Sequence, residues 1–311
     1  MDERDYALLD ILGQTGNITH AADRLFITQS ALSKRIQGIE RELDVQLLLR
    51  SRQGVRFTPE GEIVLNACHD VVNSLRQMRQ ALGGTKGKVF GTLNAGISLN
   101  YALYCLPDFL VKFRGSYPDV ELNITTGQSR RLIAMLQSGS IDLAILRGEH
   151  IWEGERTLLR RENICLIAPR EVSDEELVRM PYISRRTDAD FERTLTSWMH
   201  EKGIRPQSGG VHVDNIRTCV EMVTRELGWS IVPEICLGGF TGYIRPIRFA
   251  DGTSFIRSTY LMYNDSLLAL PQARAFVDLL KSEVGTYCGT DTEKKNEITK
   301  GGRSCSIVRK Q

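Results

Sequence analysis

The sequence predicts an α/β protein in three parts: a small all-α head with a hairpin, one long helix, and a larger C-terminal α/β region. Up to residue 82 apolar residues recur at steps of three and four, the period of a helix with one buried face. Beyond residue 89, short apolar runs alternate with helical segments. A chain of 311 residues with 41% hydrophobic residues suffices for two domains with cores of their own. The expected divisions are 1–58, 59–88, 89–287 and 288–311.

The most informative segment of the head runs from Thr28 to Leu43. Its apolar positions are spaced to form one buried helical stripe: Leu32, Ile36, Ile39 and Leu43. The opposite side is polar and free of carboxylates, with Gln29, Ser30, Ser33, Lys34 and Gln37. Amide, hydroxyl and ammonium groups match base edges and phosphates in the DNA major groove. Thr28 can cap this helix, so the segment is predicted to read DNA.

The residues around this segment supply the rest of a helix-turn-helix unit. A first helix is expected over residues 3–14, and Asn17 can cap a short helix that carries Ala21, Ala22, Leu25 and Phe26. Ile27 and Thr28 form the turn. After Leu43, two short β-prone runs flank Arg52-Gln53-Gly54, which predicts a hairpin with arginine at its tip. The alternative, amphipathic helices that only pack, would also have to explain the caps, the paired alanines and the hairpin.

The charge pattern favours a local basic surface. Lys and Arg number 40 against 38 Asp and Glu, a net charge of +2, which excludes a histone-like polycation. Residues 28–58 nevertheless contain six basic residues against three acids. The acids Asp2, Glu3, Asp5 and Asp10 are expected to face away from this surface.

Cysteine and histidine spacings show no metal site, and no cofactor motif is present. The seven cysteines are expected to be reduced thiols. The acidic N-terminus lacks a signal-peptide core, and eighteen apolar residues never run together. We therefore expect no membrane partner and a cytoplasmic location.

A long helix is predicted after the hairpin. Thr58-Pro59-Glu60 combines a capping hydroxyl, a proline at the first helical position and a carboxylate near the positive helix end. A helix from 59 to 82 would be roughly 36 Å long. Its apolar seam comprises Val64, Ala67, Val71, Leu75, Met78 and Leu82. The seam could pack against a second copy of the chain or against the chain's own second domain; a polar hinge, 85–88, follows.

The run AADRLFITQSALSKRIQGIERELDVQLLLRSRQGVRFTPEG resembles the winged helix-turn-helix of LysR-type transcriptional regulators. Ser30 stands where that family often has proline, and Leu48-Leu49-Arg50 has leucine where an aromatic is frequent. The resemblance implies a homodimer or homotetramer that binds a promoter inverted repeat and affects RNA polymerase recruitment. The implied DNA contacts are Thr28, Gln29, Ser30, Ser33, Lys34, Gln37 and, on the backbone or minor groove, Arg52.

The same resemblance implies a periplasmic-binding-protein-like effector domain with a small-molecule cleft between two lobes. Lobe I would comprise about 89–160 and 265–287, and lobe II about 161–264. Ligands of parallel sheets lie beyond the carboxyl ends of the strands, near helix N-termini. The positions that satisfy this rule are Ser98, Asn100, Gly127, Gln128, Ser129 and Arg147 in lobe I, with Ser184, Thr187 and Asn215 in lobe II. Arg147 favours an anionic effector, although each residue singly could equally be a cap or a solvated loop residue.

Two other classes remain open: an α/β enzyme, or a solute-binding protein, with an accessory helix-turn-helix. The sequence has no GxSxG, P-loop, HExxH or GxGxxG motif. A solute receptor would need export. Some members of the resembled family sense oxidants through a cysteine pair, for which Cys219 and Cys236 are the candidates; such thiols need an exposed, electropositive setting. Residues 288–311 lose apolar periodicity and are expected to form a flexible tail.

Overall fold

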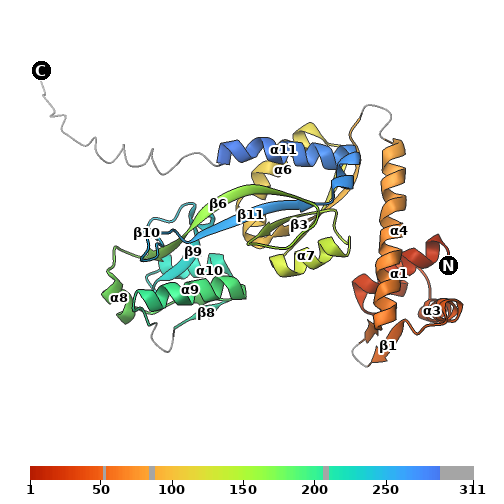
Figure 1. Cartoon of the computed structure of the whole chain (residues 1–311), viewed down its shortest axis with the longest axis horizontal. Coiled ribbons are helices and arrows are strands. Elements are labelled where there is room, and N and C mark those ends of the chain that lie inside the picture. Colours follow the sequence, from red (N-terminus) through yellow and green to blue (C-terminus); the bar gives the residue numbers. More distant parts are fainter. Residues whose placement is uncertain (52–53, 84–87, 206–209, 288–311) are drawn as a thin grey trace, which may run out of the picture.

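The computed structural model describes residues 1–51, 54–83, 88–205 and 210–287. The predicted hairpin tip at Arg52, most of the 85–88 hinge and the 288–311 tail lie outside the described residues. The predicted fold class is confirmed: a helical head with a hairpin is followed by a long helix and a mixed α/β region (Figure 1).

The head contains three helices and a two-stranded hairpin: α1 (Glu3–Thr15), α2 (Ile18–Arg24), α3 (Gln29–Leu43), β1 (Leu48–Ser51) and β2 (Gly54–Phe57). The side chain of Asn17 accepts hydrogen bonds from two N–H groups of α2, and Thr28 accepts one from the Ala31 N–H at 3.2 Å. Both predicted caps are therefore confirmed.

Apolar stripes of the three helices form the core of the head. Leu32, Ile36 and Ile39 of α3 are fully buried against Leu9 and Leu12 of α1. The prediction that Leu43 belongs to this stripe is wrong. The helix ends there, because Asp44 adopts a left-handed conformation, and the Leu43 side chain is exposed.

The long helix α4 (Pro59–Gly83) begins where the sequence predicted. Thr58 Oγ1 accepts the Gly61 N–H at 2.9 Å and so caps it. One side of α4 buries Cys68 and His69, and Val64 packs against the same core. Ile63, Val71 and Met78 remain exposed on the described part of the helix.

A seven-stranded sheet organises the C-terminal region, with strand order β10-β6-β11-β5-β3-β4 and β9 also pairing with β6. The strands are β3 (Gly91–Ser98), β4 (Val120–Gly127), β5 (Leu143–Arg147), β6 (Glu155–Ala168), β9 (Ser230–Pro233), β10 (Tyr243–Pro246) and β11 (Ile256–Tyr263). The alternation of apolar runs with helical segments predicts parallel sheets. Within this sheet, however, only β3, β4 and β5 pair in parallel, and β6 and β11 have antiparallel partners. A strand that runs parallel to the one before it needs a long crossover connection. Only the short segment 148–154 connects β5 to β6, so β6 runs in the opposite direction.

Helices cover both faces of the sheet in lobe I. The lobe I helices are α5 (Leu99–Tyr104), α6 (Leu106–Ser116), α7 (Ser129–Gln137), a 3₁₀ turn η3 (Asp265–Ala269) and α11 (Pro271–Tyr287). Phe109 and Phe113 of α6 pack edge-on against Phe276 of α11 on one face, while α7 covers the other (Figure 1). The helical segment through residues 101–113 is broken at Cys105, because Pro107 has no N–H to donate and its ring does not fit inside a helix.

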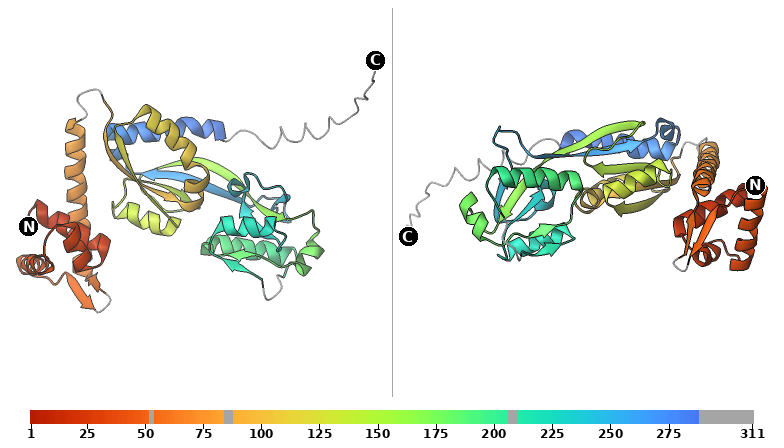
Figure 2. Two further views of the ribbon diagram at one scale, coloured as in Figure 1. Left: turned by 180° about the vertical axis from the view of Figure 1, so that it is seen from behind. Right: turned by 60° about the horizontal axis from the view of Figure 1, so that its bottom comes forward.

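Lobe II is built on the C-terminal half of β6. Its remaining elements are α8 (Asp174–Arg179), β7 (Ser184–Arg185), α9 (Ala189–Glu201), β8 (His212–Val213), α10 (Ile216–Thr224) and a 3₁₀ turn η2 (Glu234–Leu237). Trp198 and Trp229 are buried in its core. The long strands β6 and β11 connect the two lobes (Figure 2). β11, which lies in the range assigned to lobe II, pairs with β5 of lobe I.

Candidate functional site

The exposed side of α3 carries the polar residues that the sequence singled out. Five of the predicted DNA-contacting residues are exposed: Thr28, Gln29, Ser30, Lys34 and Gln37. Ser33 is half-buried. Thr28 Oγ1 and Ser30 Oγ lie 3.1 Å apart at the start of the helix. The side that faces solvent therefore offers hydroxyl, amide and ammonium groups over about two turns.

One basic residue of this region is already neutralised. Arg35 donates to Asp5 of α1 through both Nε and Nη2. Asp5 is buried, and although burial opposes it, the Arg35 guanidinium holds the pKa of that carboxyl below its usual range. The expectation that Asp5 faces away from the basic surface is thus wrong, and Arg35 serves the packing of α1 on α3.

The turn before α3 contains an aromatic residue that the sequence assigned to the preceding helix. Phe26 lies beyond the end of α2, has φ of +55° and is 95% exposed. The Ile27 N–H donates to the Ala22 carbonyl and the Phe26 N–H to the Asp23 carbonyl. This is the Schellman pattern, in which glycine normally occupies the position of Phe26.

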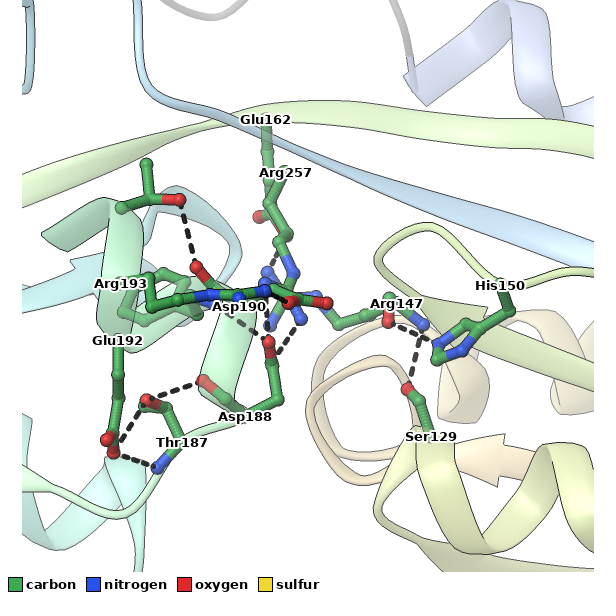
Figure 3. Close-up of polar contacts among 12 residues, drawn as sticks. Ser129, Arg147, His150, Glu162, Thr187, Asp188, Asp190, Glu192, Arg193 and Arg257 are labelled. Carbon is green, nitrogen blue, oxygen red and sulfur yellow. Dashed lines mark hydrogen bonds and ion pairs between the residues drawn. The ribbon is translucent and has the colours of Figure 1, made fainter.

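Between the lobes, a buried arginine and a buried glutamate form the centre of a charged cluster (Figure 3). Arg147, at the end of β5, donates from Nη2 to Glu162 Oε1 at 2.5 Å. The Glu162 side chain has no exposed surface, and its Oε2 accepts the Ile235 N–H of lobe II at 2.7 Å. Because Glu162 belongs to β6, this carboxylate links residues of both lobes.

Two further guanidiniums lie in the cluster. Arg160 Nε is 4.0 Å from Glu162 Oε2. Arg185, on β7 of lobe II, forms no ion pair with any described residue, and its Nε is buried without a hydrogen-bond partner. Burial and the charge of Arg147 lower the pKa of Arg185. The Nε atoms of Arg147 and Arg160 are likewise buried without a partner.

A fourth arginine of the cluster has its own counter-ion. Arg257 of β11 donates to both carboxylate oxygens of Asp188, which caps α9 by accepting the Phe191 N–H at 2.9 Å (Figure 3). Although burial opposes it, Arg257 holds the pKa of Asp188 below its usual value. This pair ties a strand shared by both lobes to a helix of lobe II.

The predicted effector residues of lobe I lie near one another at the strand ends. Ser98 and Gly127 are opposite each other at the ends of β3 and β4. Ser129 Oγ accepts the Arg147 N–H at 3.0 Å. Ser98 is buried and its hydroxyl has no hydrogen-bond partner. Asn100 is half-buried, and Gln128, the residue before α7, is exposed.

The predicted effector residues of lobe II are engaged locally. Ser184 Oγ lies 3.0 Å from His212 Nδ1, and Thr187 Oγ1 donates to Glu192 Oε1 at 3.1 Å. Asn215 caps α10 by accepting the Arg217 N–H at 2.8 Å. Sequence reasoning missed Arg160, Glu162, Arg185 and Arg257, because charged residues at strand positions give no signal until the strand register is known.

The two cysteines considered as oxidant sensors are buried. Burial raises the pKa of Cys236 to about 12 and also raises that of Cys219. A protonated, buried thiol is a poor nucleophile. Among residues 1–51, 54–83, 88–205 and 210–287, no His, Cys, Asp or Glu cluster could hold a metal ion, and no helix could span a membrane.

A helix-turn-helix head followed by a two-lobed α/β region defines a transcriptional regulator with a ligand-binding domain. Family comparison gives the same class. Residues 4–62 match the model of the bacterial regulatory helix-turn-helix protein, lysR family, and residues 86–285 match the LysR substrate binding domain. The chain belongs to the LysR family of transcriptional regulators.

Similar proteins extend over nearly the whole chain. The HTH-type transcriptional regulator YraN of Bacillus subtilis (strain 168) is 34% identical over 284 residues, which cover 91% of this chain and 98% of YraN. A full-length variant of OxyR from Pseudomonas aeruginosa has the same fold, with a TM-score of 0.66 at 20% identity, covering 91% of this chain and 94% of that one. Full-length CbnR in complex with its target DNA has a TM-score of 0.59 at 19% identity, covering 91% and 99% of the two chains.

Proposed function

We propose that this regulator binds a promoter inverted repeat as a homodimer or homotetramer in the cytoplasm and responds to an anionic small molecule held between its two lobes. The observation that supports the effector class best is the excess of arginine over carboxylate between the lobes, with three Nε atoms buried without an acceptor. Binding of the anion would shift the population of quaternary arrangements, and with it DNA bending and RNA polymerase recruitment.

DNA contact is assigned to the exposed side of α3. Gln29, Ser30, Ser33 and Lys34 would enter the major groove, with Thr28 and Gln37 at its margins and the hairpin tip at Arg52 on the flanking backbone or minor groove. The test is fluorescence anisotropy with labelled duplex from upstream of the protein's own gene. Specific binding should exceed binding to a scrambled duplex at least tenfold at matched salt, and equal affinity for both would contradict the proposal.

Self-association is assigned to α4. Val71 and Met78 continue the side of α4 that carries Val64, beyond the head core, and with the neighbouring Ile63 they form an exposed apolar stripe. A second α4 would cover this stripe. Sedimentation of the full chain at micromolar concentration should give a dimer or tetramer. Met78→Glu should shift it toward monomer, while Glu62→Gln, an exposed change on the same helix, should not.

A further inference from the structure

The charged residues between the lobes share one face of the sheet. In the strand register, Thr259 of β11 lies between Arg147 of β5 and Arg160 of β6. In the next row on the same face, Arg257 lies opposite Glu162. Directly opposed residues of antiparallel strands project to the same side. Three adjacent strands thus present three arginines, one glutamate and one threonine toward lobe II.

Carboxylates do not balance these charges. Adding Arg185 from lobe II gives four guanidiniums, which are matched by Glu162 and by Asp188 alone among the described residues. Glu234, the acid next to Ile235, accepts hydrogen bonds from the backbone N–H and the side-chain amide of Asn163, both at 3.2 Å, and is not paired with an arginine of the cluster. The described cluster therefore carries two positive charges more than negative ones.

Two guanidiniums of the cluster are placed to hold a ligand from both sides. Arg147 comes from lobe I and Arg185 from lobe II, and the Nε–H of each is buried without an acceptor. The hydroxyl of Thr259, fully buried in the same row, has no partner either. A guanidinium binds an oxyanion through two parallel N–H donors, and a buried cation without a counter-ion destabilises the protein that contains it.

We infer that the effector is a small dianion, with negative oxygens held by Arg147 of lobe I and Arg185 of lobe II, and not a monoanion. This inference rests on the proposed function and adds the charge of the ligand to it. Two carboxylates on one short molecule or a single phosphate group would supply the same chemistry. Either would neutralise the two excess charges and connect the lobes.

The experiment compares matched probes on the full chain at constant ionic strength. Isothermal titration measures the dicarboxylates malonate, succinate, glutarate and adipate, the monocarboxylates with the same carbon numbers, and inorganic phosphate. At least one dianion should bind tenfold more tightly than its matched monoanion. Phosphate binding without dicarboxylate binding would identify a phosphate ligand. Equal binding of monoanions and dianions would overturn the inference and leave an anionic effector standing, whereas no binding by any probe would count against both.

Two variants test the role of Arg185. Arg185→Gln should lower the affinity for the best dianion at least tenfold and change the affinity for monoanions less than threefold. Without ligand it should also unfold at a higher temperature than the parent, because it removes a half-buried cation whose Nε has no acceptor and whose charge meets the Phe191 ring but no carboxylate. Arg225→Gln removes an exposed lobe II cation and should alter neither quantity. Unchanged dianion affinity in Arg185→Gln would contradict the two-lobe arrangement.

Discussion

The exposed polar side of α3 and the arginine cluster between the lobes both present basic and polar groups, but in opposite surroundings. On α3 the polar side chains face solvent, and the buried acid Asp5 neutralises the arginine beside them. Between the lobes, three guanidiniums each have an Nε that is buried without an acceptor. Exposed groups lose little when they have no ligand, because water solvates them. Buried groups depend on internal partners or on a ligand.

The largest expected effect comes from removing the internal partner in the lobes. Glu162→Gln leaves Arg147 and Arg160 without a counter-ion, and breaking a buried pair in this way typically costs about 3–5 kcal/mol. Urea unfolding of the C-terminal region should show this loss. Glu221→Gln, which breaks an exposed pair with Arg225, should change stability by less than about 0.5 kcal/mol. Similar effects for both variants would contradict the distinction between buried and exposed pairs.

The opposite pattern is expected on α3. Ser33→Ala with Lys34→Ala should weaken binding to promoter DNA by roughly 1–3 kcal/mol. It should also lower the dependence of log affinity on log salt by about one, because one phosphate contact is lost. Thermal stability should hardly change, since Lys34 is exposed and Ser33 is a small, half-buried residue. Unfolding of the double variant would show that these residues support the core instead.

A smaller gain in stability is expected at the turn before α3. Phe26→Gly should stabilise the head by about 1 kcal/mol, because glycine adopts a positive φ without strain. Phe26→Ala removes the same ring but keeps the strain and serves as the matched control. Urea unfolding of both variants separates backbone from side chain. If the glycine variant is no more stable than the alanine variant, the turn is not strained.

The two regions also differ in how far the sequence predicted them. On α3, local periodicity and capping residues predicted the helix, its cap and its exposed side, because both signals lie within one short segment. Between the lobes, the sequence identified Arg147 and Ser129, which are the last residue of β5 and the first residue of α7. It missed Glu162 and Arg185. Glu162 reaches Arg147 only through the register of β6 with β11, and Arg185 lies on β7 of lobe II, distant in sequence from Arg147. Non-local pairing of this kind leaves no periodic signal.

The smallest expected effect is a pH dependence at the junction of α1 and α4. His69 is buried, and its Nδ1 lies 2.5 Å from Asp10 Oδ1. Burial alone would lower the pKa of His69. The hydrogen bond to Asp10, a hydrogen bond to the Gly139 backbone and the charges of Asp10 and Asp70 together raise it above the ordinary value of 6.5.

A histidine whose pKa is higher in the folded state than in the unfolded state stabilises the protein fully below pH 6.5. That contribution disappears as the pH rises through the folded-state pKa. His69→Gln should therefore cost more stability at about pH 5.5 than at about pH 8.5, as measured by urea unfolding of the head. His20→Gln, at an exposed position on α2, controls for the general effect of pH. A cost for His69→Gln that does not vary with pH would show that the imidazole is held by packing, so that the charged Asp10 pair contributes nothing at this junction.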